Sequence, residues 1–223
     1  MKIIMPMACV HVGAESHDRE RLLRDLADAR RLGAIIYLVG DAIDNQVYAG
    51  TKHTGTVYEA KLNPDEQIDE VISLFRRHHV GGVLGGNHPE RTKKAAGIHP
   101  EKVIADRLSV AFHPEVLATR IEGHSFVFTH GVGSNDNDFK KVLLAYDGVD
   151  CICIGHNHEL SYRPVRRVET LPGRRKTKVV HQVRCGSYLD YAAYARRALY
   201  APTPTGCPRI TVMPHDIKVD IHA

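Results

Sequence analysis

The feature that most constrains the fold is a series of short apolar runs separated by helical segments. The clearest run is AIIYLVGD at residues 34–41, which is apolar at almost every position and shorter than an ordinary helix. Such a run is typical of a strand that is buried on both faces of a sheet. Comparable runs predict four further strands, at residues 3–13, 80–88, 121–131 and 148–158.

The segments between these runs have the features of helices. Residues 16–33 place apolar side chains on one helical face and end at a glycine. Residues 63–79 begin with Asn63 as an N-cap and Pro64 at the first helical position. Shorter helices are predicted at residues 89–97, 99–108 and 137–148. Strands that alternate with helices, followed by strand-rich segments at residues 178–188 and 207–223, predict an α/β or α+β layered fold.

The size of the chain favours one domain over residues 1–223, which can bury a sizeable core without a disulfide or metal. The five cysteines are odd in number and show no paired framework, so we expect free thiols and a cytoplasmic location. Cys151 and Cys153 alternate with apolar neighbours and are predicted to be core residues. We expect neither a membrane span, which needs about 18 apolar residues, nor a secretory signal.

Side chains that can bind metals or protons follow the predicted strands, at the point where each strand ends. Because ligands of open α/β sheets gather outside the carboxyl ends of the strands, we expect these side chains to converge on one crevice. They are Cys9, His11, Asp41, Asn87, His88, His130, His156 and His158. Taken alone, Cys9 and His11 have two interpretations. If both lie on one face of a strand, they are either a pair of metal ligands or a core thiol beside a hydrogen-bonded histidine.

The residue types suit a pair of metal ions. Two ions about 3.5–4 Å apart need a ligand that bridges them, and a carboxylate such as that of Asp41 has two oxygens for this purpose. Neutral imidazoles and an amide oxygen fill other positions without adding negative charge, so the site stays receptive to a phosphate. The formal net charge of +4 is compatible with an anionic substrate.

The order of these motifs resembles the calcineurin-like metallophosphoesterase superfamily, from residue 9 to about residue 187. The superfamily has Asp-x-His, Gly-Asp-x-x-Asp, Gly-Asn-His-Asp/Glu, a lone His-Gly and Gly-His-x-His. The corresponding segments here are CVH, GDAID, GNHPE, THG and GHNH, in the same order, with a Gly-Ser in the later CGSY. The resemblance implies the metallophosphoesterase fold, with a two-sheet β-sandwich core flanked by helices.

The resemblance also implies two divalent metal ions, of which Mn, Zn, Fe and Ni are candidates. One ion would be bound by Cys9, His11, Asp41 and His158, and the other by Asp41, Asn87, His130 and His156. His88 would donate to the phosphate or protonate the leaving oxygen. The implied reaction is hydrolysis of a phosphate ester by hydroxide, because a divalent cation lowers the pKa of bound water from 15.7 toward about 7.

The sequence departs from the superfamily pattern at two positions. Cys9 stands where the superfamily has aspartate, and Pro89 displaces the usual acid after His88 to Glu90. We interpret Cys9 as a metal ligand, with a loosely held first ion as the alternative. A thiolate would favour zinc or iron over magnesium and would make the site oxidisable. Asp44 is interpreted as a supporting or turn residue and is not placed in the site.

The leading function is a phosphodiesterase that acts on a nucleotide or nucleic acid, with a phosphomonoesterase as the alternative. A metal-poor scaffold of the same fold, like the retromer subunit, would be expected to have lost several ligands. Residues 163–180 predict a basic hairpin, which either contacts a nucleic-acid backbone or is a solvated surface. Tyrosines interleaved with Arg196 and Arg197 either stack a base or pack in the core.

Overall fold

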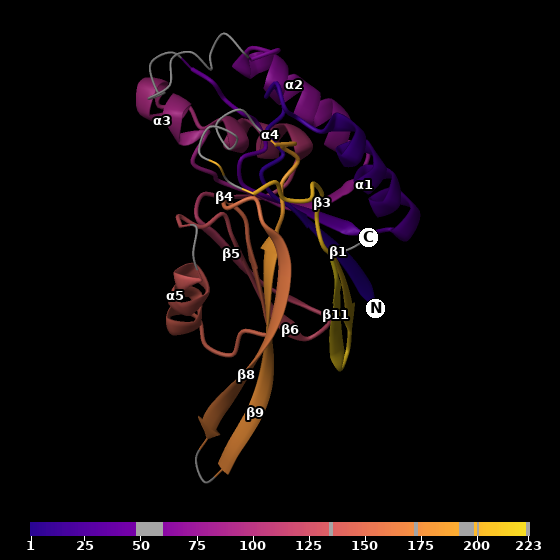
Figure 1. Cartoon of the computed structure of the whole chain (residues 1–223), viewed down its shortest axis with the longest axis vertical. Helices are drawn as coiled ribbons and strands as arrows, with labels where there is room; N and C mark the ends of the chain where they lie inside the picture. Colours follow the sequence, from indigo (N-terminus) through magenta and orange to yellow (C-terminus); the bar gives the residue numbers. More distant parts are fainter. Residues whose placement is uncertain (48–59, 134–135, 172–173, 192–198, 200, 222–223) are drawn as a thin grey trace.

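Two β-sheets packed face to face, with helices on their outer faces, make up the molecule (Figure 1). The computed structural model describes residues 1–47, 60–133, 136–171, 174–191, 199 and 201–221. The first sheet contains β1 (Lys2–Met7), β2 (Ile35–Val39), β3 (His79–Leu84), β4 (Phe112–His113), β10 (Arg209–Met213) and β11 (Asp216–Asp220). Its strand order is β11-β10-β1-β2-β3-β4, and β1 to β4 run parallel.

The second sheet has the strand order β5-β6-β7-β9-β8. Its strands are β5 (Val116–Ile121), β6 (His124–Thr129), β7 (Cys151–Ile154), β8 (Leu160–Leu171) and β9 (Arg174–Cys185). The central strands β6, β7 and β9 are parallel. This arrangement confirms the predicted α/β layered fold with two sheets, although β5 was not predicted because its polar residues interrupt the apolar pattern.

Helices cover the outer face of each sheet. They are α1 (Arg19–Leu32), α2 (Pro64–Phe75), α3 (Glu90–Ala96), α4 (Pro100–Leu108) and α5 (Asn137–Ala145). Buried residues of α1, α2 and α4 pack against the first sheet, and those of α5 against the second. Asn63 is the N-cap of α2, as predicted. Asn63 and Glu66 form a reciprocal capping box there.

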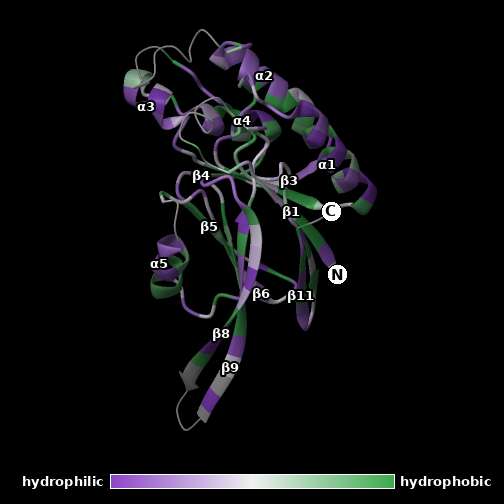
Figure 2. Ribbon diagram, in the orientation of Figure 1, coloured by the Kyte–Doolittle hydropathy of each residue, from purple (hydrophilic) through white to green (hydrophobic). Residues whose placement is uncertain are grey.

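Strand β2 shows why the run at residues 34–41 is almost wholly apolar. Ile36 and Leu38 lie in the core beneath the helices, whereas Tyr37 and Val39 lie in the core between the sheets. Successive residues of a strand point to opposite faces, so a strand with a core on each side needs apolar residues throughout. Figure 2 shows hydrophobic residues along strands of both sheets, while α1 and α2 also carry hydrophilic ones.

Strands β1 and β7 are shorter than predicted, and this corrects the expected backbone near the site. Strand β1 ends at Met7, so the prediction that Cys9 and His11 share a strand face is wrong. Both residues have left-handed backbones, with φ of 49° and 50°. The physical reason is that their N–H groups bond to the loop after β2, Cys9 to the Gly40 carbonyl and His11 to the Asp41 carbonyl.

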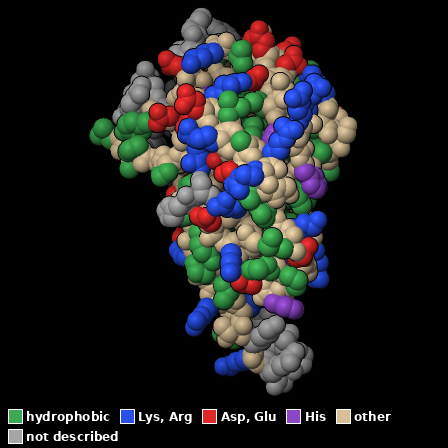
Figure 3. All heavy atoms as spheres, turned by 90° about the vertical axis from the view of Figure 1, so that its right-hand side faces the viewer, with side chains coloured by type: hydrophobic (Ala, Val, Ile, Leu, Met, Phe, Trp, Pro, Cys, Tyr) green, Lys and Arg blue, Asp and Glu red, His purple; other side chains and the backbone are tan. Residues whose placement is uncertain are grey.

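Strands β8 and β9 pair antiparallel from Leu160↔Cys185 to Leu171↔Arg174, where the sequence predicts a hairpin. They project beyond the rest of the molecule (Figure 1), and Lys and Arg side chains are visible along the projection (Figure 3). The turn predicted at Pro172-Gly173 and the segment with Arg196 and Arg197 lie outside the described residues. Among the described residues, no helix is long and apolar enough to cross a membrane.

Candidate metal centre

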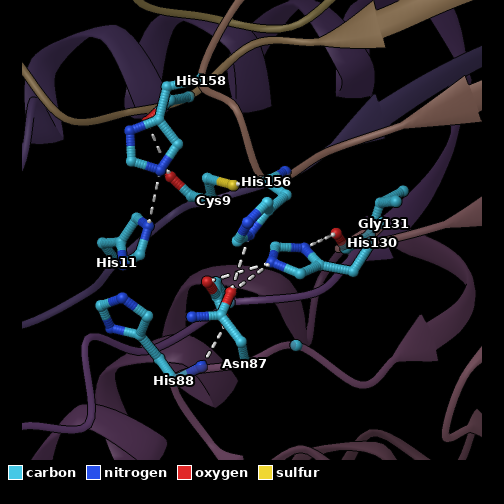
Figure 4. A network of polar contacts seen from close by, with 12 residues as sticks. Cys9, His11, Asn87, His88, His130, Gly131, His156 and His158 are labelled. Carbon is cyan, nitrogen blue, oxygen red and sulfur yellow. Dashed lines mark hydrogen bonds and ion pairs between the residues drawn. The ribbon is translucent and has the colours of Figure 1, made fainter. Parts of the chain in front are cut away.

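All eight candidate residues lie in the loops that follow strand ends. Cys9 and His11 follow β1, and Asp41 follows β2. The remaining residues follow β3, β6 and β7: Asn87, His88, His130, His156 and His158. Because the parallel strands of both sheets end on the same side, the side chains converge, as Figure 4 shows. The structure therefore brings together every residue that the sequence predicts for the site.

The backbone is strained at the centre. Nine non-glycine residues of the described chain have positive φ, and five of them are candidate residues: Cys9, His11, Asp41, His156 and His158. Such conformations cost about 1 kcal/mol or more each, and they cluster where function requires a particular side-chain direction. The prediction that an extended backbone places His156 and His158 on one side is wrong, because both residues are left-handed.

One set of side chains, here called the Cys9 group, consists of Cys9, His11 and His158. Its ligand atoms all lie within 4.8 Å of one another. The Nε2 atoms of His11 and His158 face each other at 3.3 Å (Figure 4). The Cys9 thiol is fully buried and accepts a hydrogen bond of 3.3 Å from the backbone N–H of His156.

The Cys9 group is electrically neutral near pH 7. Burial lowers the pKa of His11, and burial together with the nearby His11 lowers the pKa of His158 to about 3. Their ring nitrogens therefore keep lone pairs that can bind a metal. Burial, with the negative charge of Asp41, raises the pKa of the Cys9 thiol well above its ordinary value. A cation beside the sulfur would favour the thiolate and displace this proton.

A second set, here called the Asn87 group, consists of Asn87, His130 and His156. The Asn87 Oδ1 atom lies 2.9 Å from His156 Nδ1 and 3.0 Å from His130 Nε2 (Figure 4). The other nitrogen of His130, Nδ1, lies 3.0 Å from the Val39 carbonyl oxygen and donates to it. This bond directs His130 Nε2 into the centre, as second-layer hydrogen bonds do for metal-binding histidines.

Asp41 lies between the two groups and is buried. Its Oδ2 atom is 3.1 Å from His130 Nε2, and its carboxylate also lies within 4.8 Å of ligand atoms of Cys9 and His11. Burial alone would raise the pKa of Asp41, but His130 and His88 hold it well below the ordinary value. Burial likewise opposes protonation of His130, yet Asp41 raises the pKa of that histidine to about 9. The two residues form an ion pair that a cation can replace.

The spacing of the ligand atoms fits a divalent cation. Two ligands bound about 2.0–2.1 Å from one ion, with angles of about 90–109°, lie roughly 2.8–3.4 Å apart. Asn87 Oδ1 lies 2.9 Å from His156 and 3.0 Å from His130, His130 Nε2 lies 3.1 Å from Asp41, and the Nε2 atoms of His11 and His158 lie 3.3 Å apart. Sulfur, nitrogen and oxygen donors converge here in three overlapping groups. The residues present therefore fit the divalent cations that the motif resemblance implies.

Comparison with known proteins gives the fold. No protein-family model and no curated protein sequence matches the chain. A solved archaeal phosphodiesterase matches over 98% of both chains, with a TM-score of 0.53 and 12% identity. The chain has the metallophosphoesterase fold. The shared fold is the one that the motif resemblance implies.

Two other similar solved structures have TM-scores below 0.5. Yfce, a phosphoesterase from E. coli, is 14% identical, with a TM-score of 0.45, over 93% of this chain and 86% of its own. A metallophosphoesterase from Sphaerobacter thermophilus is 15% identical, with a TM-score of 0.43, over 84% of this chain and 77% of its own.

Within the metallophosphoesterase fold, His88 lies beside the Cys9 group and contacts Asp44. His88 Nδ1 is 2.7 Å from the Asp44 carbonyl oxygen and 3.2 Å from its carboxylate, which also lies 3.5 Å from His11 Nδ1. Burial alone would raise the pKa of Asp44, but His11 and His88 hold it well below its ordinary value. Glu90 instead pairs with Lys93 and Lys94. Asp44 is thus the acid beside His88, and the second aspartate of GDAID was the signal for it.

Glu101 lies beside the candidate centre, and the sequence did not indicate it. It lies in the first turn of α4, where an acidic residue ordinarily needs no explanation beyond the helix dipole. Its carboxyl group is fully buried and accepts hydrogen bonds from the N–H groups of Ala42 and Gly86. Burial and the nearby charge of Asp41 raise the pKa of Glu101 to about 8.

Proposed function

We propose that the chain is a metal-dependent phosphohydrolase that acts on a phosphodiester through two divalent ions. The observation that carries this proposal is the convergence of three overlapping groups of ligand atoms beyond the strand ends. The metallophosphoesterase fold supports it. The archaeal protein of the same fold, described as a phosphodiesterase, is only 12% identical and supports the reaction type by analogy.

In this proposal Asp41 is shared by two ions. One ion would be held by Asp41 and the Cys9 group, and the other by Asp41 and the Asn87 group. When bound, two divalent cations supply positive charge at the phosphoryl oxygens and acidify a water molecule. Manganese, zinc, iron and nickel are candidates, with the Cys9 sulfur favouring zinc or iron.

His88 is the group that meets the substrate. Its Nδ1–H donates to the Asp44 carbonyl, which orients the ring and leaves Nε2 for the substrate. In its doubly protonated form, which the Asp44 carboxylate 3.2 Å from Nδ1 stabilises, His88 uses the proton on Nε2 to donate a hydrogen bond to a phosphoryl oxygen or to protonate the leaving oxygen. General acid catalysis of this kind contributes about 100- to 10,000-fold. Asp44 keeps the ring in this orientation without touching the substrate.

The substrate class proposed is a nucleotide or nucleic acid. The support comes from the hairpin formed by β8 and β9, where Arg166, Arg167 and Arg175 are exposed. Exposed arginines along a projecting hairpin can neutralise a phosphate backbone. The five free, buried cysteines support a reducing compartment such as the cytoplasm.

The test is metal analysis of the purified protein together with hydrolysis assays. Aryl phosphodiesters and aryl phosphomonoesters are assayed with added Mn²⁺, Zn²⁺ or Ni²⁺, and we expect faster hydrolysis of the diester. Faster hydrolysis of the monoester would make the chain a phosphomonoesterase. The proposal fails if neither ester is hydrolysed with any of these metals, or if His156→Ala leaves the activity unchanged.

A further inference from the structure

One buried carboxyl group joins the two loops on which the centre depends. Glu101 of α4 accepts a hydrogen bond of 3.3 Å from the N–H of Ala42 and one of 2.8 Å from the N–H of Gly86, each on a different carboxyl oxygen. Ala42 directly follows Asp41, in the loop after β2 that is here called the Asp41 loop. Gly86 directly precedes Asn87, in the loop after β3 that is here called the Asn87 loop. The side chain is completely buried, and its bond to Ala42 is buried while its bond to Gly86 is partly buried.

The two loops pack closely at the position of Glu101. A Cβ atom on Gly86 would collide with the Asp41 carboxylate and with the Asp41 backbone nitrogen. The N–H of His88, which follows Asn87, donates to Asp41 Oδ1 at 2.9 Å. Direct packing and the His88 bond hold the two loops in contact, and Glu101 adds a bond to the backbone of each loop.

We propose that Glu101 is a positioning residue that fixes the Asp41 loop to the Asn87 loop and so sets the geometry of the ion held by Asp41 and the Asn87 group. This inference rests on the proposed two-metal function. Glu101 itself is not a catalytic residue, because its carboxyl oxygens bond to backbone N–H groups and the side chain has no exposed surface.

The effect of Glu101 is selective for one of the two ions. The Cys9 group is tied to the Asp41 loop by other bonds, from Cys9 N–H to the Gly40 carbonyl and from His11 N–H to the Asp41 carbonyl. These bonds remain when the Glu101 carboxylate is removed. The link between Asp41 and Asn87 loses one of its supports, so the ion held by the Asn87 group is the one that weakens.

The main variant is Glu101→Gln, which preserves the volume of the side chain. Its amide oxygen can accept one of the two N–H groups, while its NH₂ group faces the other and cannot accept from it. Glu101→Ala is the second variant and removes both acceptors. The control is Ile104→Val, a fully buried residue of the same helix that loses one methyl group and has no hydrogen bond to either loop.

The experiment is a titration of the metal-free full-length protein with Co²⁺, followed by its visible d–d spectrum. We expect two binding steps in the wild type. In Glu101→Gln one step weakens by about 10- to 100-fold, the range seen when partners of metal ligands are mutated, while the other changes several-fold less. Glu101→Ala should weaken the same step further, and Ile104→Val should resemble the wild type.

Several results overturn the inference. If the wild type binds Co²⁺ in two steps and Glu101→Gln changes neither, or weakens both equally, Glu101 has no selective positioning role and the two-metal proposal stands. The same conclusion follows if Ile104→Val reproduces the loss. If the wild type binds no Co²⁺, the proposed function fails and the role of Glu101 fails with it.

Discussion

The Cys9 group and the Asn87 group occupy the same centre but are held in place by different forces. The Asn87 group is linked by hydrogen bonds and by the ion pair between His130 and Asp41. In the Cys9 group two neutral imidazoles face each other, and all three residues have left-handed backbones. The Asn87 group is therefore preorganised by charge, whereas the Cys9 group is preorganised by backbone conformation.

This difference suggests what a cation does in each group. In the Asn87 group it displaces a proton from His130, since Asp41 raises the pKa of that histidine to about 9. In the Cys9 group it would take the place of the hydrogen bond between the Nε2 atoms of His11 and His158, and it would displace the proton of the buried thiol. Uptake of metal by either group is therefore linked to release of a proton.

Replacing Asp41 should weaken metal binding by both groups, and this variant has the largest expected effect. Asp41→Asn takes away the carboxylate shared by both ions, so kcat/KM on an aryl phosphodiester should fall by about 1,000-fold or more, because each ion contributes several kcal/mol. Metal content should fall from two ions toward none. Asp106→Asn, which changes an exposed carboxylate on α4, is the control and should keep both activity and metal.

If Asp41→Asn retained two ions and normal kcat/KM, Asp41 would not be a shared ligand. Loss of a single ion with the other unchanged would place Asp41 in one group alone.

The pH dependence of stability should separate the groups in the metal-free protein. His130 has a pKa of about 9 in the fold against about 6.5 when unfolded, so its stabilising contribution is complete below pH 6.5 and is lost as the pH rises through 9. The loss should be on the order of 3 kcal/mol. His158, with a pKa of about 3 in the fold, stays neutral in the folded protein across this range and contributes no such loss; only its unfolded form is protonated below about pH 6.5, so its contribution rises with pH there.

The measurement is urea unfolding in a metal chelator at intervals from pH 6 to pH 9.5. Glu101, whose pKa is also raised by burial, adds a decrease in the same direction between about pH 4.5 and 8. The contribution of His130 is therefore taken from the difference between wild type and His130→Gln. A wild-type curve parallel to that of His130→Gln would show that the ion pair with Asp41 does not form.

The sequence predicted the parts of this molecule that depend on local pattern. A short run that is apolar at almost every position, such as residues 34–41, has few alternatives to a strand with a core on both faces. Polar residues directly after such strands, such as Asp41 and Asn87, must lie at the carboxyl edge of the sheet. Fold class and the convergence of the candidate residues followed from these two facts, and their roles as ligands stay predictions.

The rest depends on contacts between segments that are distant in the sequence. Cys9 turns away from the strand geometry because its N–H bonds to Gly40, which no pattern around Cys9 indicates. In the sequence, Glu101 looks like any acidic residue in the first turn of a helix. Its contacts arise only when α4 packs against the loops that carry Asp41 and Asn87. The acid beside His88 is Asp44 rather than the nearer Glu90, because the proline-started helix α3 directs Glu90 toward Lys93.

Asp44→Asn should test the Cys9 group separately from the Asn87 group. The carboxylate of Asp44 contacts His11 and His88 but no member of the Asn87 group among the contacts described. We expect the ion at the Cys9 group to weaken by about 10- to 100-fold, and kcat to fall because His88 is less firmly oriented. Co²⁺ titration and steady-state kinetics measure the two effects separately.

Asp44→Asn and Glu101→Gln should therefore weaken different binding steps, and the double variant should weaken both. If both single variants affected the same step, the two groups would not be independent sites, and the division of the centre drawn from the structure would be wrong.

The smallest effect is expected from Cys9→Asp, which restores the residue type of the superfamily motif. A carboxylate supplies the same negative charge with a shorter bond, about 2.0–2.2 Å against about 2.3 Å for zinc and sulfur, but it is a harder ligand. The preference for Zn²⁺ over Mn²⁺ at the Cys9 group should fall by about tenfold, because the carboxylate is the harder ligand.

The pKa of the Cys9 thiol is raised by burial, so metal uptake by the wild type should strengthen with rising pH more steeply than uptake by Cys9→Asp. Competition titrations with Zn²⁺ and Mn²⁺ at pH 6.5 and 8.5 measure both quantities. Unchanged preference together with an unchanged pH slope would mean that the thiolate is not a ligand, and that the left-handed backbone at Cys9 serves to orient His11 alone.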